Sequence, residues 1–335
     1  MQATSADDFA RTWVESGFSP SQAAKVLGIH IRNVHARRAH LEAQGYVLPT
    51  ITDDLTAHDM AYTLREEFAI ENGTAVIVSD RHKWPGDGVT AAEAALYTIL
   101  PTLKPDFFVM NGDLFDGAGL SRHPPLGWER KPNVQDELEA CKEVLDHIEF
   151  LLTPGTPKFY TVGNHCRRFD YKLALTASDY RGISGFRLGD HFSNWKMSWS
   201  LHVNRGVEGG HTVIKHKHRQ GVGAARNNAM PAGLNIVTGH THALGIAPIE
   251  DYRGRRWGVE CGFLSHKRHA AFEYAEDAPS YSRPGFVVLT WRSGVLLPPE
   301  LVEVDDAGVA WFRGDAVAVH KPKVRIKANY APFHE

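Results

Sequence analysis

The sequence is poor in cysteine and contains no long apolar run. Its three cysteines, Cys141, Cys166 and Cys261, are odd in number and widely spaced, which argues against a disulfide framework and against a CxxC zinc site. The absence of any run of about 18 apolar residues argues against a transmembrane helix. Residues 1–13 lack a basic segment followed by an apolar one, so we expect no secretory signal. We therefore expect a soluble protein in the reducing cytoplasm, without a membrane partner.

The chain also has almost no net charge, with a formal value of −2 over 335 residues. Binding of nucleic acid through the overall charge is therefore excluded, and any basic surface must be local. Histidine is abundant, with 19 residues. This side chain is a common metal ligand and proton carrier near neutral pH, so the positions of the histidines matter more than their number.

The N-terminal residues 8–45 are expected to be helical. The stretch Ser19–Arg38 predicts a short helix, a turn at Gly28 and a second helix, which together resemble a helix-turn-helix. Ser19 can cap the first helix, and Pro20 can occupy its first position. The second helix is expected either to contact nucleic acid or to serve dimerisation and packing. Its candidate nucleic-acid contacts are Arg32, Asn33, Arg37 and Arg38.

The pattern of apolar residues changes beyond Gly73, where short runs of β-branched and aromatic residues predict buried strands. Longer stretches between them predict helices, and this alternation indicates an α/β or layered α+β domain. The predicted strands are Ala75–Ser79, Phe107–Met110, Lys158–Val162, Thr212–Lys215, Leu234–Thr238, Trp257–Glu260 and Gly285–Trp291, and the helices are Ala91–Leu100 and Asn133–Leu152. The expected segments are a helix-turn-helix over 1–46, a linker with a bridging helix (Tyr62–Ile70) over 47–72, a large domain over 73–300 and a C-terminal extension over 301–335.

Five predicted strands are each followed by residues suited to metal or proton chemistry. In open α/β sheets, ligands gather at the carboxyl ends of strands. Carboxylates, imidazoles and an amide oxygen together suit a divalent metal ion. The five segments are Asp80–His82, Asn111–Asp116, Gly163–His165, His216–His218 and Gly239–His242.

The order D-x-H, GDxxD, GNH, H, GHxH resembles that of the calcineurin-like metallophosphoesterases over about residues 73–292. The resemblance implies a calcineurin-like β-sandwich flanked by helices, which holds two divalent ions that clamp the attacking and leaving oxygens of a phosphate ester. We expect Mn²⁺, although Fe, Zn or Ni would fit the same residues. By this resemblance, Asp80, His82 and His242 bind one ion, Asn164, His216 and His240 bind the other, and Asp113 bridges them.

The resemblance also implies catalytic roles. A metal-bound hydroxide would attack the phosphate, and His165 would protonate the leaving alkoxide as general acid. Asp116 would orient His165, with a turn or capping role as its alternative. Arg81, Arg167 and Arg168 flank the motifs and are expected either to bind phosphate oxygens or to be solvated neighbours.

Two positions depart from the family pattern. Cys166 stands where an acidic residue is usual, so the support of the His165 loop is in question; we expect Cys166 to be a small buried residue. The isolated histidine motif is His216-Lys-His218. If the strand continued, both histidines would lie on one side. We expect His216 to be the ligand because it ends the run, with His218 as the alternative.

The substrate class is less specified than the reaction class. Gly112–Asp116 resembles the motif of double-strand-break repair nucleases in this superfamily, and the helical segment resembles that of phage phosphoesterases. The loop Gly117–Lys131 is expected to form either a substrate wall with an aromatic platform at Trp128 or a packed surface loop. We expect a phosphodiesterase or nuclease acting on nucleic acid or a nucleotide. The alternatives are a phosphomonoesterase, including a protein phosphatase, whose helices serve targeting or homodimer formation, and a non-catalytic DNA-binding regulator.

Overall fold

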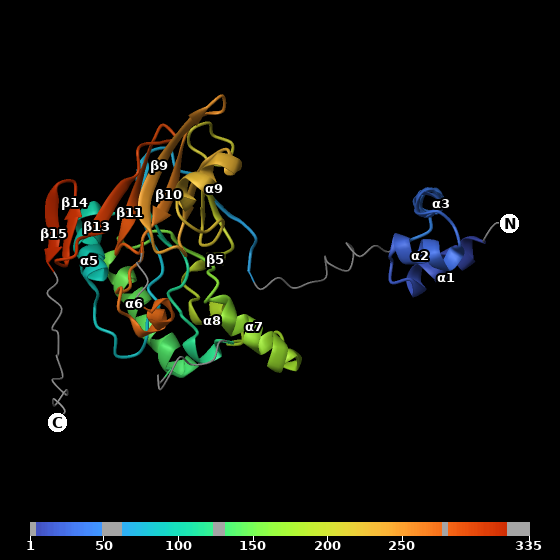
Figure 1. Ribbon diagram of the computed structural model, residues 1–335, viewed down its shortest axis with the longest axis horizontal. Helices are drawn as coiled ribbons and strands as arrows, with labels where there is room; N and C mark the ends of the chain where they lie inside the picture. The colour runs from blue at the N-terminus through green and yellow to red at the C-terminus, as the bar shows by residue number, and fades with distance from the viewer. Residues whose placement is uncertain (1–4, 49–61, 123–130, 277–280, 320–335) are drawn as a thin grey trace, which may run out of the picture. The chain divides into compact units, whose positions relative to one another are not determined.

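The computed structural model describes residues 5–48, 62–122, 131–276 and 281–319 (Figure 1). The chain divides into two compact units, Met1–Ala61 and Tyr62–Glu335. Within the described ranges, no helix has both the length and the apolar character needed to cross a membrane.

The first unit contains three helices, α1 (Ala6–Glu15), α2 (Pro20–Leu27) and α3 (Ile31–Ala43). The Ser19 side chain accepts a hydrogen bond from the backbone N–H of Gln22, Pro20 opens α2, and Gly28 ends it with a φ of 64°. The predicted cap, first position and turn are therefore confirmed. The core of this unit consists of the buried residues Phe9, Trp13, Ala23, Val34, Leu41 and Leu48.

The bridging helix expected from Tyr62 to Ile70 does not form. Strand β1 (Glu66–Phe68) lies there instead and pairs in parallel with β6 (Leu201–Val203). Phe68 packs against the rings of Phe107 and Phe159. The sequence prediction was wrong because these tertiary contacts, which a local pattern does not contain, favour the extended backbone.

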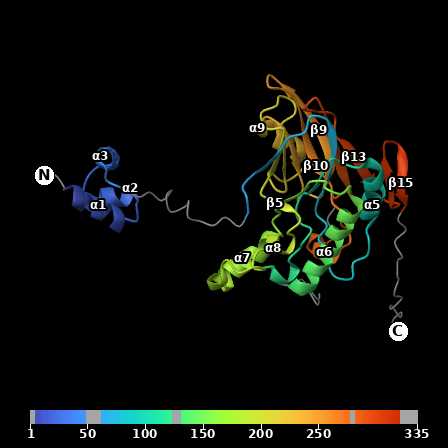
Figure 2. The same cartoon turned by 180° about the vertical axis from the view of Figure 1, so that it is seen from behind.

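The second unit contains two packed β-sheets with helices on their outer faces (Figure 1 and Figure 2). One sheet has the strand order β1-β6-β7-β8-β10-β9, and the other has the order β15-β14-β13-β11-β2-β3-β4-β5, with β12 beside β11. The strands are β2 (Gly73–Val78), β3 (Phe107–Met110), β4 (Lys158–Thr161), β5 (Lys196–Ser198), β7 (Thr212–Lys215), β8 (Asn235–Thr238), β9 (Leu244–Asp251), β10 (Gly254–Cys261), β11 (Gly285–Arg292), β12 (Val295–Leu296), β13 (Glu300–Val304), β14 (Val309–Phe312) and β15 (Asp315–Val319).

The helices of this unit cover both sheets. Helices α5 and α6 pack on the larger sheet, and α9 packs on β8, β9 and β10 of the smaller one. Their bounds and those of the short helices are α5 (Ala91–Leu103), η1 (Ala118–Leu120), α6 (Val134–Leu151), α7 (Arg167–Thr176), η2 (Ser178–Tyr180), α8 (Leu188–His191), α9 (Ala224–Ala232) and η3 (Ala270–Ala275).

Alternation along the central strands fills two apolar layers. In β2, Ala75 and Ile77 enter the layer between the sheets, whereas Val76 and Val78 enter the layer beneath α5 and α6. Because both faces are covered, such strands are continuous apolar runs. The seven predicted strands and the two predicted helices all form, although several begin or end a few residues from the expected bounds.

The larger sheet continues past residue 300. Strands β13, β14 and β15 follow β11 as consecutive antiparallel neighbours. Val302, Val304 and Ala310 belong to the layer beneath the helices. The expected C-terminal extension therefore includes three strands of this sheet.

Candidate metal centre

The five motif segments follow strands whose carboxyl ends meet. Strands β2, β3 and β4 run parallel in the larger sheet, and β7 and β8 run parallel in the smaller one. The loops after them bring titratable side chains of both sheets together, as ligand sites at strand ends require. Among the described residues, the clusters able to hold a metal ion are Asp80–His82–His242, Asp113–His216–His240 and His82–Asp116–His165.

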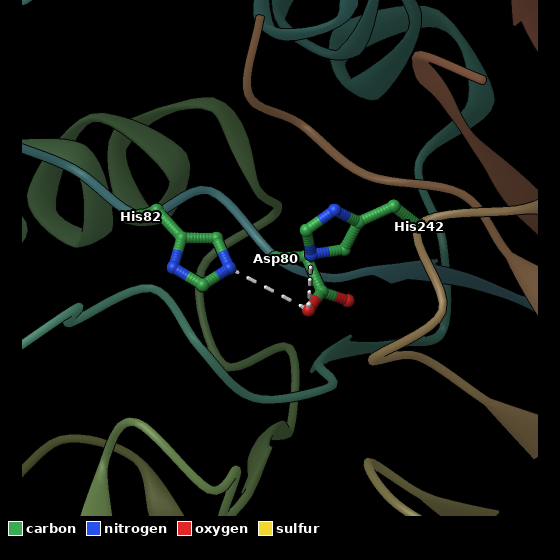
Figure 3. Close-up of side chains that lie close together, drawn as sticks. All are labelled: Asp80, His82 and His242. Atoms are coloured by element: carbon green, nitrogen blue, oxygen red, sulfur yellow. Dashed lines mark ion pairs between the residues drawn. The ribbon is translucent and has the colours of Figure 1, made fainter. Parts of the chain in front are cut away.

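The carboxylate of Asp80 has one fixed oxygen and one free oxygen. Oδ2 accepts hydrogen bonds from the backbone N–H of His240, at 2.9 Å, and from the Ser79 hydroxyl. Oδ1 is buried without a hydrogen-bond partner, 3.3 Å from Nε2 of His242 and 3.7 Å from Nε2 of His82. Figure 3 shows both imidazoles directed at this oxygen. The arrangement places a carboxylate oxygen that accepts no hydrogen bond among imidazole nitrogens.

Asp113 repeats the pattern in the second cluster. Its Oδ1 accepts from the backbone N–H of His165 at 2.9 Å, while Oδ2 is buried without a hydrogen bond and lies 2.9 Å from Nε2 of His216. Oδ1 of Asn164 is likewise buried and unpartnered. The second cluster joins the first, because Nε2 of His216 also lies 3.8 Å from Oδ1 of Asp80.

The second ring nitrogens of two histidines are held from behind. Nδ1 of His216 donates to the carbonyl oxygen of Asn111 at 2.7 Å, and Nδ1 of His82 lies 3.0 Å from Oδ1 of Asp116. Contacts of this kind fix the ring orientation and leave Nε2 as the atom directed at the cluster.

The electrostatics of the clusters favour added positive charge. Burial lowers the pKa of His82, but hydrogen bonds with Asp116 and Asp80 outweigh it and raise the pKa to about 10. Burial also opposes protonation of His216, yet Asp113 and Asp80 raise its pKa to about 9. Buried carboxylate oxygens without hydrogen bonds raise the pKa values of the neighbouring imidazoles, which indicates a site that favours bound cations. The donor set of carboxylate, imidazole and amide therefore fits divalent ions.

Backbone strain is concentrated at the same place. Five site residues have φ values in the left-handed region, which costs a non-glycine residue about 1–2 kcal/mol. The surrounding fold must hold them there, and such strain is typical of ligand sites. The residues and their φ values are Asp80 (55°), His82 (46°), Asp113 (49°), His240 (69°) and His242 (59°).

Two motif glycines allow the loops to approach this closely. A Cβ at Gly163 would lie 2.0 Å from Oδ1 of Asp113. A Cβ at Gly239 would lie 2.2 Å from the Ser79 hydroxyl oxygen and 2.8 Å from Oδ2 of Asp80. Both glycines are therefore required by the carboxylates rather than by the turns alone.

His165 lies beside the first cluster with a partner on each nitrogen. Its Nδ1 is 2.6 Å from Oδ1 of Asp116, and its Nε2 is 3.4 Å from Nη2 of Arg168. The Arg168 guanidinium also donates to the backbone oxygen of Asp116 at 2.9 Å. Asp116 thus contacts both His82 and His165 and links the two rings.

Glu137 also belongs to this network, although its sequence context gave no indication of it. Its Oε1 accepts from the backbone N–H of Gly117 at 2.6 Å, which fixes the turn after Asp116. Burial and the charge of Asp116 raise the pKa of Glu137 to about 8. Because Glu137 lies inside α6 among ordinary helical residues, no local motif distinguishes it.

The three flanking arginines differ in position. Arg81 is 1% exposed, and its Nε lies 2.7 Å from Oε1 of Glu93. Its expected contact with phosphate is therefore wrong, because this guanidinium is already buried against a carboxylate. Arg167 is exposed, with its guanidinium over the Trp199 ring at 5.2 Å. Only Arg168 lies beside the general-acid candidate.

The two departures from the family pattern have structural explanations. Cys166 is buried, and its Sγ accepts from the backbone N–H of Asp113 at 3.3 Å, so it supports the Asp113 loop from within the core. Burial raises the pKa of this thiol. His216 is buried in the cluster, whereas His218 is exposed, because β7 ends at Lys215 and the alternation does not continue.

Two expected contact regions remain. In the loop Gly117–Lys131, residues 123–130 lie outside the described ranges, and Trp128 is among them. On α3, Arg32 and Asn33 are exposed and Arg37 is half-buried. Arg38 donates to Oε1 of Glu42 at 2.7 Å and lies over the Trp13 ring, so its charge is already paired within its own unit.

Comparison with known proteins agrees with the motifs. The family model for calcineurin-like phosphoesterases matches residues 73–228. This region is a calcineurin-like phosphoesterase domain. It contains the whole His82–Asp116–His165 cluster and the residues Asp80, Asp113 and His216 of the other two clusters, whose remaining members, His240 and His242, follow the matched region. The chain is 28% identical over 244 residues to the Gene 54 proteins of Mycobacterium phages L5 and D29, which covers 68% of this chain and 92% of each relative.

Solved structures of similar proteins include Vps29 from Entamoeba histolytica complexed with zinc and a predicted phosphoesterase from Streptococcus pneumoniae. The first is 12% identical, with a TM-score of 0.40, and the match covers 73% of this chain and 99% of that one. The second is 11% identical, with a TM-score of 0.30 and coverage of 70% and 90%.

Proposed function

We propose that the phosphoesterase domain hydrolyses a phosphodiester of nucleic acid or of a nucleotide with the help of two divalent ions. One observation carries the proposal. Asp80 and Asp113 each have one carboxylate oxygen fixed by a backbone N–H and the other left buried and unpartnered beside imidazoles. In this proposal, the first ion is held by Asp80, His82 and His242, the second by Asn164, His216 and His240, and Asp113 lies between them.

The ions would supply positive charge to the phosphate and ease the deprotonation of a water molecule. Residues of the chain would position the carboxylates, donate the proton and bind the phosphate. The backbone N–H groups of His240 and His165 hold the two carboxylates. Nδ1–H of His165 donates a hydrogen bond to Asp116, which orients the ring so that a proton carried on Nε2 can be given to the leaving oxygen. Arg168 lies beside that nitrogen and can bind a phosphate oxygen.

The experiment that tests the proposal is a substrate panel with each metal added separately. We expect Mn²⁺ to support turnover of bis-p-nitrophenyl phosphate better than of p-nitrophenyl phosphate, with Fe, Zn and Ni as comparisons. Cyclic nucleotides and single- and double-stranded DNA complete the panel. A preference for the monoester would indicate a phosphatase instead of a diesterase. No turnover with any metal would refute the proposed enzymatic activity.

We propose further that α3 contacts nucleic acid through Arg32, Asn33 and Arg37, without Arg38. The exposure of the first two supports the proposal. Fluorescence anisotropy with labelled DNA in a NaCl titration tests it. Removing one cation that neutralises a phosphate reduces the log–log salt slope by about 0.9. We expect Arg32→Ala to flatten the slope and the matched change Arg11→Ala, on α1, to leave it unchanged. Absence of binding at low salt would leave α3 as a packing or dimerisation element.

A further inference from the structure

A pocket of about 570 Å³ opens beside the metal centre on the side of His240. Its size lies within the range of about 300–1,000 Å³ that is common for small-molecule sites. The lining includes His240 and Thr241 from the loop after β8, the segment 220–223, Glu260 and Tyr281. No residue of the His82–Asp116–His165 cluster lines it. The pocket and the centre therefore share His240 but lie away from His165.

Two lining residues present apolar surface to solvent. Val222 is 75% exposed and Tyr281 is 73% exposed. An accessible aromatic face beside a hydrolytic centre offers a platform on which a planar ring can stack. The chain two residues after Tyr281 is tied to the centre, because the backbone N–H of Arg283 donates to the carbonyl oxygen of His242 at 2.9 Å.

Among the polar side chains of the lining is the buried carboxylate of Glu260. Its Oε1 accepts from the Thr241 hydroxyl at 2.6 Å, and its Oε2 accepts from the backbone N–H of Ala225 at 3.2 Å. No ion pair with Glu260 is found in the part of the chain that the structure describes. The cation of the lining, Arg283, is paired with Glu303 at 2.8 Å instead. A carboxylate without an ion pair repels a second phosphate and accepts hydrogen bonds from N–H donors, for which each oxygen retains a lone pair.

The position of His165 decides which part of a diester this pocket can hold. A general acid must lie next to the leaving oxygen, and His165 lies with His82 and Asp116 in a cluster that does not line the pocket. The pocket therefore lies on the side of the substituent that stays on phosphorus.

We propose that this pocket binds the nucleobase of the nucleoside that stays esterified to the phosphate, with Tyr281 as the stacking platform and Glu260 as the acceptor for a base N–H. The inference rests on the proposed function and narrows its substrate class to nucleotide phosphodiesters.

Two esters with the same leaving group test the pocket: thymidine 5′-(p-nitrophenyl phosphate) and methyl p-nitrophenyl phosphate. We expect the wild-type protein with Mn²⁺ to favour the thymidine ester in kcat/KM by at least about tenfold, as the energy of one base–aromatic stack predicts. Tyr281→Ala should reduce that ratio about tenfold, mainly through KM, and Tyr281→Phe should preserve it. Tyr252→Ala, which alters a fully exposed tyrosine outside the pocket, is the matched control.

The role of Glu260 is tested without a mutation by the N3-methylthymidine ester, which has no ring N–H. We expect its kcat/KM to fall several-fold below that of the thymidine ester. Two results would contradict base binding in this pocket: equal kcat/KM values for the thymidine and methyl esters, or a ratio that Tyr281→Ala leaves unchanged. Neither result would contradict the proposed phosphodiesterase activity. If neither ester is hydrolysed with any metal, the proposed function fails, and the pocket proposal fails with it.

Discussion

The three-helix unit begins its helices at side chains that accept backbone N–H groups, such as Ser5 and Ser19, and among its described residues only Phe18 has a left-handed φ outside glycine. In the phosphoesterase domain, by contrast, five residues at the metal centre have left-handed φ values, and its buried carboxylates have oxygens without partners. In the helical unit, the capping side chains accept hydrogen bonds from backbone N–H groups that would otherwise have no partner, and this stabilises the helices. Strain and unpartnered atoms persist where a ligand is to complete the structure. The comparison can be tested by removing one group at a time.

The largest effect is expected from Asp113→Asn, which removes the carboxylate charge of the Asp113–His216–His240 cluster while keeping the size of the side chain. We expect the metal content after loading with Mn²⁺ to fall from about two ions per chain and turnover to fall to background. Elemental analysis and diester hydrolysis measure both. Asp179→Asn, at an exposed site, is the matched control. Full metal content in the Asp113 variant would contradict the role.

His165→Ala should come next, with metal binding retained. A general acid contributes about 10²–10⁴-fold, so we expect losses of that order for esters with poor leaving groups. An activated nitrophenolate needs less protonation and should lose less. Steady-state rates on an alkyl and a nitrophenyl diester provide the comparison, and equal losses would argue against proton donation by His165.

Matched glycine-to-alanine substitutions compare the effects on turnover and on stability in the two units. Gly163→Ala would place a methyl group 2.0 Å from Oδ1 of Asp113 and should reduce turnover about 10²-fold, as a misplacement of about 1 Å can. Gly28→Ala meets no atom within 4 Å, but it requires a left-handed alanine. We expect it to cost the helical unit about 1–2 kcal/mol without affecting turnover. Similar losses of activity in both variants would refute the distinction.

The smallest effect is a pH dependence of stability away from the centre. Nδ1 of His202 lies 3.0 Å from Nε2 of His211, and burial, Arg65 and His211 lower the pKa of His202 from 6.5 to about 4. Between pH 4 and 6.5 this histidine is protonated in the unfolded chain but neutral in the folded chain. The free energy of unfolding is therefore highest above pH 6.5 and falls as the pH drops towards 4. We expect a loss on the order of 1–2 kcal/mol in urea unfolding, after allowance for solvent screening.

His202→Gln removes this titration and should make the dependence on pH shallower, while His35→Gln, at an exposed position on α3, should leave it unchanged. An unaltered pH profile in the His202 variant would assign the acid sensitivity to other groups.

The sequence was sufficient for the central strands and for the loops that follow them, because buried apolar runs and short motifs are local patterns. It was insufficient where partners are distant in the chain. The sequence places Arg81 within a motif, but Glu93 of α5 buries its guanidinium. Glu137 supports the turn after Asp116 from a helix without any motif of its own. Edge strands were also missed, among them β9, where Pro248 obscures the strand pattern.

Because the clustered side chains come from loops of both sheets, the centre is completed only when the two sheets have docked. Asp80 and His242 lie far apart in the chain, and contacts of such long sequence separation slow folding. Ions that bind only the assembled centre would shift the folding equilibrium by mass action. Metal supply during synthesis would then affect the yield of folded protein as well as the activity of each molecule.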